Sequence, residues 1–228
     1  MSSYVLAPQA QPSVPVEGEA ARFPVHRIYC IGRNYADHAK EMGHAPEKGE
    51  PIFFMKPADA VVADGRAGRY PSATKNLHHE VELVVALGAG GRDLVERDAL
   101  ELVYGYAVGI DLTRRDLQTA AKNRGAPWDT GKGFDDSAPI SQIVRAQGRH
   151  PHAERLTLSV NGVPKQSTQV ADMLWPVVEI IVELSRLYEL KPGDLIFTGT
   201  PAGVGPLLPK DRVECELVGW AKLSFGFA

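Results

Sequence analysis

Two pairs of residues in this sequence have types and spacing that could do chemistry. The first is Glu80-Val81-Glu82, which opens an apolar run that continues to Leu87. Alternate residues of a strand point to the same side of a sheet, so these two carboxylates are expected to share one face and to repel one another. A hard divalent cation such as Mg²⁺ would relieve that repulsion, because it prefers oxygen ligands. Taken alone, such a pair is more often two harmless surface glutamates than a metal site.

The second pair is His38 and Glu41, three residues apart on one face of the short helix predicted for residues 33–43. A carboxylate beside an imidazole fixes the histidine tautomer and raises its basicity, which suits a general base. The spacing alone favours an ordinary surface ion pair. The position of the pair, after a buried strand and a Gly-Arg-Asn turn, keeps the catalytic interpretation open.

Three other places could contribute to such a site. Asp111 ends the strand predicted for residues 103–111, where it is either a third oxygen ligand or a turn residue before a helix. Lys132 lies between two glycines, so it either approaches the anion of a ligand or is exposed in a flexible turn. The Gly/Thr-rich stretch 198–205 follows a strand and offers backbone N–H groups and hydroxyls for a carboxylate, but it lacks the order of a nucleotide-binding motif.

The elements that must position these residues are readable from local signals. Asn34 is expected to cap the helix at its N-terminus, and Gly43 is expected to end it. Thr113 has the spacing of a capping box for a second helix. Residues 154–169 are expected to form a hairpin around Asn161-Gly162 with a purely structural role.

Strands outnumber helices, and they do not alternate regularly with them, which predicts an α+β, β-rich fold with a large mixed sheet system. Residues 1–24 contain four prolines, and we expect an extended arm over the surface with a short strand near residues 14–16. Residues 25–228 are expected to form a single catalytic domain. The clearest helix is the periodic apolar stretch 175–190.

Composition excludes several functional classes. The 25 basic and 28 acidic residues give a formal charge of −3, so there is no basic excess for nucleic acid or an anionic membrane. No run approaches the roughly 18 apolar residues of a membrane span, and no secretory signal precedes Arg22. Cys30 and Cys215 lie in apolar runs and are expected to be reduced, buried thiols. We therefore expect a cytoplasmic protein.

Five motifs occur together, in one order, from about residue 26 to the end of the chain. They are Gly32-Arg33-Asn34-Tyr35-Ala36-Asp37-His38 with Glu41, His79-Glu80-Val81-Glu82, the stretch from Gly109 to Gln118, Lys132-Gly133-Phe134-Asp135, and Thr198 to Gly205. In this set and order the chain resembles the fumarylacetoacetate hydrolase family. Lys56-Pro57-Ala58-Asp59, the doubled His78-His79 and Pro127-Trp128 resemble in particular its short bacterial members that act on fumarylpyruvate or other acylpyruvates.

The resemblance assigns a role to each position that matches a motif. It implies that Glu80, Glu82 and Asp111 bind Mg²⁺, or Mn²⁺, and that His38 and Glu41 activate water. It further implies that Lys132 holds anionic oxygens of the substrate. Substrate contacts are expected from Arg33, Asn34, Gln118 and Thr200. The fold that it implies is a mixed β-sandwich roll of the type of the family's C-terminal domain, usually in a homodimer.

The activity implied by the resemblance is metal-dependent hydrolysis of a C–C bond in a 2,4-dioxo acid. The expected substrate is fumarylpyruvate, cleaved to fumarate and pyruvate in gentisate-type aromatic catabolism. A related reaction on a 2-oxo acid, such as oxaloacetate decarboxylation or a lyase or isomerase reaction, would use the same metal without an attacking water. A non-enzymatic metal-binding protein is a third, distant alternative, against which the intact His38–Glu41 pair argues.

Overall fold

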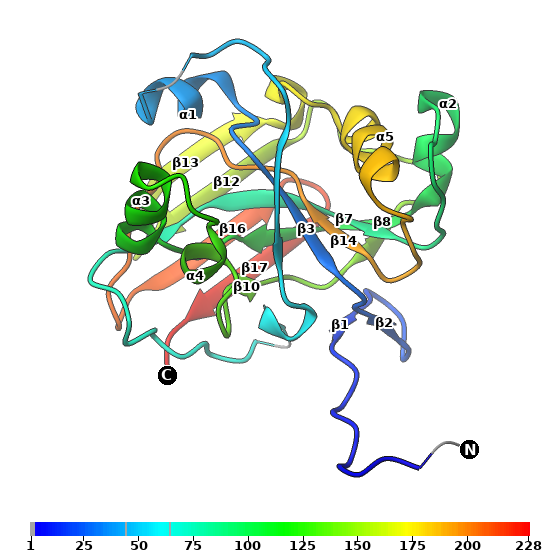
Figure 1. The fold of residues 1–228 in the computed structure, drawn as a ribbon, viewed down its shortest axis with the longest axis horizontal. Helices are drawn as coiled ribbons and strands as arrows, with labels where there is room; N and C mark the ends of the chain where they lie inside the picture. Colours follow the sequence, from blue (N-terminus) through cyan, green and yellow to red (C-terminus); the bar gives the residue numbers. More distant parts are fainter. Residues whose placement is uncertain (1–2, 44, 64) are drawn as a thin grey trace.

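A computed structural model describes residues 3–43, 45–63 and 65–228 (Figure 1). Its larger sheet is mixed and contains six strands. In spatial order these are β11 (Val144–Arg145), β8 (Val103–Ile110), β7 (Val81–Leu87), β14 (Leu195–Phe197), β3 (Ile28–Gly32) and β4 (Ile52–Lys56). Strand β14 pairs parallel with β3 and antiparallel with β7, which brings together segments more than 100 residues apart in the chain.

The second sheet is antiparallel and contains four strands. Their order is β13 (Val163–Gln169), β12 (Arg155–Val160), β16 (Arg212–Leu217) and β17 (Ala221–Gly226). Buried and exposed residues alternate along β16 and β17, as expected for strands with one face on a core. Their inward side chains pack with those of β7 and β8, so the two sheets form a sandwich. The α+β, β-rich prediction is confirmed.

Strand β7 is buried along its whole length because each of its faces is covered. Val81, Leu83 and Val85 belong to the core between the two sheets. Val84 and Ala86 face a second apolar core with Ile28 and Phe197. A strand apolar on both faces is typical of the centre of a covered sheet. Because β7 is packed on both faces, the side chains directly before and after it are held in fixed positions.

The remaining elements are short. Five helices occur in the described residues: α1 (Ala36–Glu41), α2 (Glu96–Ala99), α3 (Arg115–Asn123), α4 (Asp129–Lys132) and α5 (Val177–Leu187). Three turns are 3₁₀: η1 (Ala58–Ala60), η2 (Leu100–Leu102) and η3 (Val170–Asp172). Small sheets are formed by β1 (Ser13–Pro15) with β2 (Arg22–Pro24), by β5 (Val61–Val62) with β10 (Ala138–Pro139), and by β15 (Gly205–Pro206), β6 (Leu77–His79) and β9 (Thr113–Arg114). None of these helices is long and apolar enough to cross a membrane.

Two predicted helix caps are wrong. Helix α1 begins after Tyr35, without a side-chain cap, because the Asn34 amide bonds the backbone of Trp175 and Thr198 instead. Helix α3 follows Arg114, also without a side-chain cap, because Thr113 lies in β9 and donates its hydroxyl to the Asp111 carbonyl. In both cases a partner outside the helix satisfies the polar side chain that local spacing had assigned to a helix end.

The N-terminal segment divides into two parts: residues 3–11 are exposed, as in an arm, whereas parts of residues 12–25 are built into the fold. Strands β1 and β2 pair antiparallel, which agrees with the strand expected near residues 14–16. Val14 and Phe23 are buried in the second core beside Val25. Residues 1 and 2 lie outside the described residues.

Candidate active site

One cavity is lined by most of the residues that the sequence pointed to. Its lining includes Arg33, His38, Glu80, Glu82, Asp111, Gln118, Lys132 and Thr200. Glu80 and Glu82 flank the first residue of β7, and Asp111 follows the last residue of the neighbouring strand β8. The strand register places Val81 opposite Ile110, and the Asp111 N–H donates to the Glu80 carbonyl at 2.8 Å. The pairing of two buried strands thus brings the three carboxylates together.

The three carboxylates form a compact, buried cluster. One oxygen from each of Glu80, Glu82 and Asp111 lies within 4.8 Å of the others. Three oxygen donors at this spacing are a suitable donor set for a hard divalent cation. The predicted metal ligands are therefore close enough in space to act on one ion.

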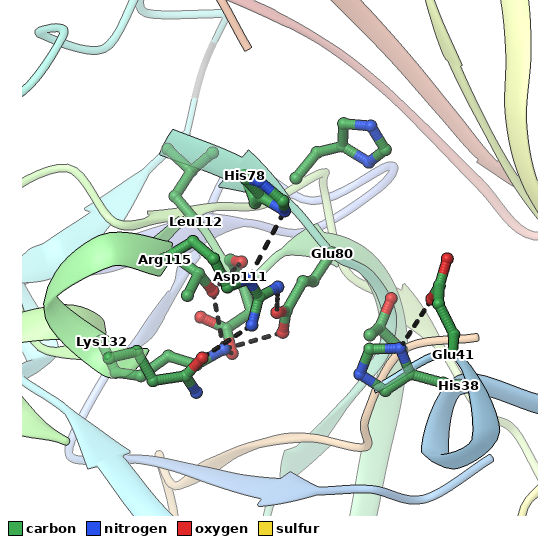
Figure 2. Close-up of polar contacts among 12 residues, drawn as sticks. His38, Glu41, His78, Glu80, Asp111, Leu112, Arg115 and Lys132 are labelled. Carbon is green, nitrogen blue, oxygen red and sulfur yellow. Dashed lines mark hydrogen bonds and ion pairs between the residues drawn. The ribbon is translucent and has the colours of Figure 1, made fainter. Parts of the chain in front are cut away.

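Three basic side chains neutralise part of this cluster, and Figure 2 labels two of them, Lys132 and Arg115. Lys132 Nζ donates to Glu80 Oε2 at 2.7 Å and also forms an ion pair with Asp111. Arg115, from the start of α3, donates to the other oxygen of Glu80. Lys56, at the end of β4, lies 2.8 Å from Asp111 Oδ1. All three cations are buried, so the interactions are poorly screened by water.

The electrostatics leave two carboxylate positions incompletely satisfied. Burial alone would raise the pKa of Glu80, but Lys132 and Arg115 hold it well below its usual range. Glu82 has no ion pair among the described residues, and burial together with Asp111 and Glu80 raises the pKa of Glu82 well above its usual range. Asp111 Oδ1 is buried beside the Lys56 ammonium, but within the described chain it has no hydrogen bond of suitable geometry. A buried Glu82 without an ion pair and a buried Asp111 oxygen without a hydrogen bond are what a bound divalent cation would stabilise, so the residues present fit the group.

A histidine–carboxylate pair lies at the edge of the same cavity (Figure 2). His38 is buried, and its Nδ1 lies 3.2 Å from Glu41 Oε2, so Nδ1 carries the proton that it donates to the carboxylate. Burial lowers the pKa of His38, although Glu80 and Glu41 each raise it. The imidazole is therefore neutral near pH 7, and Nε2 is left as a proton acceptor.

The backbone of the loop 198–205 binds one acid of the carboxylate cluster and the acid of the His38–Glu41 pair. The Gly199 N–H donates to Glu82 Oε2 at 2.7 Å, and the Gly203 N–H donates to Glu41 Oε1 at 3.0 Å. Gly199 has φ +91°, and a Cβ there would lie 2.7 Å from Cβ of Asn34, so only glycine fits. The loop does bind carboxylates, as its composition suggested, but they are carboxylates of this chain.

The predicted substrate-contacting residues divide into two groups. Gln118 and Thr200 are buried in the cavity wall, and Arg33 lines the same cavity with a left-handed φ of 59°. Asn34 does not line it. Its amide instead donates to the carbonyls of Trp175 and Thr198 and accepts from the Trp175 N–H. This amide therefore joins three segments that surround the site.

Lys132 is held in place by close packing of two helices. Helix α4 lies against α3, and a Cβ on Gly131 would approach the backbone N of Gln118 to 2.9 Å. Of the two interpretations left open for Lys132, exposure in a flexible turn is wrong, because Asp129–Lys132 is a helical turn with a buried lysine. Gly131 allows the contact that places Lys132 beside Gln118.

Sequence reasoning missed a buried glutamine that supports the site. Gln166 comes from the hairpin β12–β13, which had been expected to be purely structural. Its carbonyl accepts from the Val81 N–H at 3.1 Å and lies 3.0 Å from His79 Nδ1. Its amide group donates to Thr200 Oγ1 at 2.8 Å and to the Pro201 carbonyl at 2.9 Å. No local signal marks it, because its neighbours along β13 are polar and exposed.

Arg115 and Lys56 are two further basic residues that contact the carboxylate cluster, and the sequence did not predict this role for them. Arg115 lies in the motif from Gly109 to Gln118, and its position in the first turn of α3 brings its side chain to Glu80. Lys56 lies at the end of β4, and it is buried beside Asp111.

The chain is similar to known proteins over most of its length. Residues 27–227 match the family described as fumarylacetoacetate (FAA) hydrolase C-terminal. A fumarylpyruvate hydrolase of Ralstonia sp is 44% identical over 185 residues, which are 80% of this chain and 96% of that protein. The mitochondrial oxaloacetate tautomerase FAHD1 of Mus musculus is 42% identical over 199 residues, which are 87% of this chain and 90% of that protein.

A solved structure matches over nearly the whole chain. The fumarylpyruvate hydrolase from Pseudomonas aeruginosa, crystallised in complex with Mn²⁺ and pyruvate, superimposes with a TM-score of 0.95 at 47% identity. The match covers 99% of each chain. Another structure, described as a putative fumarylpyruvate hydrolase from Burkholderia cenocepacia, gives a TM-score of 0.92 at 50% identity, over 100% of this chain and 96% of that one. The chain therefore belongs to the fumarylacetoacetate hydrolase family and is an enzyme of that family.

Proposed function

We propose that this enzyme is a metal-dependent hydrolase that cleaves a C–C bond of a 2,4-dioxo acid. The substrate that we propose is fumarylpyruvate, with fumarate and pyruvate as products. The observation that carries the proposal is that one cavity contains both an acidic triad suited to a divalent cation and the neutral imidazole of a His–Glu pair. The similarity to proteins named fumarylpyruvate hydrolase supports the choice of acyl group.

Glu80, Glu82 and Asp111 would hold the cation. When bound, a divalent cation supplies a Lewis acid for the oxygens of the α-keto acid and for the enolate that leaves. The compared Pseudomonas aeruginosa structure is described with Mn²⁺. We propose Mg²⁺ or Mn²⁺ here, since oxygen ligands of this kind accept both.

His38 is proposed as the general base. Glu41 holds the Nδ1–H, so Nε2 accepts a proton from water, and the hydroxide attacks the carbonyl of the acyl group. The C–C bond to the pyruvyl carbon then breaks, and its electron pair remains on the pyruvyl fragment as an enolate. Protonation of that enolate gives pyruvate, while the oxygen of water remains in the new carboxylate of the acyl product.

Lys132, Gln118 and Thr200 are proposed to contact the substrate. The Lys132 ammonium is buried, and although burial opposes its charge, Asp111 and Glu80 raise the pKa of Lys132. It therefore stays protonated and can stabilise negative charge that develops on substrate oxygens. The Gln118 amide and the Thr200 hydroxyl add neutral hydrogen-bonding groups to the same wall.

A second function is favoured by the similarity to the murine oxaloacetate tautomerase, which covers 90% of that protein. Isomerisation or decarboxylation of oxaloacetate would use the cation and the keto-acid contacts without an attacking water. Hydrolysis needs the His38–Glu41 pair to activate water, whereas isomerisation or decarboxylation of oxaloacetate does not. A Glu41→Gln variant that loses hydrolysis but keeps activity on oxaloacetate would separate the two reactions.

The test of the proposed function is an assay of fumarylpyruvate, acetylpyruvate and oxaloacetate side by side, with Mn²⁺ or Mg²⁺ and with EDTA. We expect equimolar fumarate and pyruvate from fumarylpyruvate with metal, and loss of that activity with EDTA. Turnover of oxaloacetate alone would instead favour the second function.

The remaining expectations from the resemblance belong to the same proposal. We propose a homodimer, a cytoplasmic location and a role in the breakdown of aromatic compounds of the gentisate type. The mass in solution, measured by light scattering, tests the dimer directly. A mass near 49 kDa, which is about twice that of the 24.7 kDa chain, is expected.

A further inference from the structure

A second, larger chamber opens outside the candidate active site. It has a volume of about 670 Å³ and shares four lining residues, Arg33, Met42, Lys122 and Trp128, with the inner cavity. The inner cavity measures only about 30 Å³, room for one or two water molecules. A substrate whose reacting end lies at the acidic triad must therefore extend its acyl group into the outer chamber.

The outer chamber contains two positive charges and no negative one. Arg33 and Lys122 line it, and its described lining includes no aspartate or glutamate. Neither residue has an ion pair among residues 3–43, 45–63 and 65–228. Arg33 Nε is also buried without a hydrogen bond there. Lys56, Lys132 and Arg115 differ in this respect, because each is paired with a carboxylate of the inner cluster.

The two cations are close enough to affect one another. Burial lowers the pKa of Lys122 to about 8, and the positive charges of Arg115 and Arg33 add to this effect. Lys122 Nζ also lies 4.8 Å from the centre of the Trp128 ring, which forms one wall. Partly buried like charges without a counter-ion are unfavourable, and a bound anion would remove that cost.

Helix α3 connects the chamber to the acidic triad. Arg115, Gln118 and Lys122 are spaced i, i+3 and i+7, so they lie on one face of the helix. The helix rise of about 1.5 Å per residue places Lys122 about 10 Å along the axis from Arg115. Arg115 bonds Glu80. The face thus runs from the inner carboxylates to the outer chamber, over a distance comparable to an extended dicarboxylate.

We propose that Arg33 and Lys122 bind the terminal carboxylate of the substrate's acyl group, so that this enzyme selects 2,4-dioxo acids that end in a second carboxylate. The inference rests on the proposed function and identifies the residues that determine its specificity. Neutral acylpyruvates would lack the group that these two cations recognise, and they would be poorer substrates.

The test compares fumarylpyruvate, which has the terminal carboxylate, with acetylpyruvate, which does not. Lys122→Met keeps the length of the side chain and removes the charge. We expect it to lower kcat/KM for fumarylpyruvate by about 10- to 100-fold, mainly through KM, because a charge-assisted hydrogen bond is lost. The loss for acetylpyruvate should be at least ten times smaller. Lys122→Arg should restore most of the preference.

A matched control and a binding measurement separate this inference from the proposed function. Lys75→Met, at an exposed lysine outside both cavities, should leave kcat/KM unchanged for both substrates. Calorimetry should show that Lys122→Met binds fumarate about 10-fold or more weakly than the wild-type protein does. Equal losses for both substrates, or fumarate binding unchanged by Lys122→Met, would overturn the inference. Failure of the wild-type enzyme to cleave either substrate would overturn the proposed function, while the fumarate measurement would still decide the inference.

Discussion

At the scale of single residues, the candidate site depends on which buried carboxylates have partners. Glu80 is held ionised by Lys132 and Arg115, whereas Glu82 has only the Gly199 N–H as a close donor in the described chain. The sequence identified these acids from their types and order. It could not predict which of them the basic side chains neutralise, because Lys56, Arg115 and Lys132 approach from three separate elements.

Replacing His38 with alanine should abolish most hydrolysis without affecting metal binding. A positioned general base contributes typically 10²- to 10⁴-fold, so we expect kcat on fumarylpyruvate to fall by about that factor. Steady-state kinetics at saturating Mn²⁺ measure this effect. His152→Ala, at an exposed histidine, is the control. Full activity of His38→Ala would show that His38 is not the base.

The pH dependence follows from the direction of the His38 shift. Burial lowers the pKa of His38, so its neutral, proton-accepting form persists below the usual pKa of about 6.5. The acidic limb of kcat/KM should therefore lie below pH 6.5. Glu41 raises the pKa of His38, so Glu41→Gln should move this limb to still lower pH and reduce the plateau. An acidic limb that moves upward in Glu41→Gln would contradict the pairing.

At the scale of elements, the site is assembled by strand register and by turns between strands and helices. Strands β7 and β8 were predictable because their residues are apolar, and the hairpin β12–β13 was predictable from Asn161-Gly162. The capping errors arose because partners outside the helices satisfied both side chains: Trp175 and Thr198 bond Asn34, and Asp111 and Lys132 bond Thr113. The contribution of β13 was unpredictable, since Gln166 acts on β7 only after the two sheets pack.

Gln166→Leu should lower stability as well as activity. It removes the acceptor of the buried Val81 N–H, and leaving such a donor unsatisfied costs about 1–3 kcal/mol. Thr200 also loses the donor that orients its hydroxyl, so the KM for fumarylpyruvate should rise. Urea unfolding measures the first effect.

The control for this substitution is Gln142→Leu, at an exposed glutamine, which should change the free energy of unfolding by less than about 0.5 kcal/mol. If both variants unfold at the same urea concentration, the Gln166 bonds do not stabilise the contact between the sheets.

At the scale of the whole molecule, two packed sheets support one cavity at the end of their central strands. The α+β class and the sandwich roll were predictable, the first from the strand pattern and the second from the resemblance. The sheet order was not, because β14 enters between β7 and β3 from a distant part of the chain. Lys56, Lys132 and Arg115 neutralise part of the acidic cluster, so we expect the protein to fold before metal binds.

Metal binding should therefore raise the melting temperature without being required for folding. At a Mn²⁺ concentration about 100 times Kd, binding stabilises the folded state by about 2.7 kcal/mol. For a domain of this size that corresponds to an increase of about 5–10 °C. Glu82→Gln should remove most of the shift, and far-UV circular dichroism of the metal-free protein should be unchanged. An equal shift in Glu82→Gln would exclude Glu82 as a ligand.

The most direct test of the proposed hydrolysis is the fate of the water oxygen. Fumarylpyruvate should be cleaved in H₂¹⁸O with Mn²⁺ present, and the products should be analysed by mass spectrometry at early times. We expect one ¹⁸O in the new carboxylate of fumarate, and we expect the labelled product to be lost in His38→Ala and in the presence of EDTA. Fumarate without label, or no cleavage while oxaloacetate is still converted, would contradict this expectation.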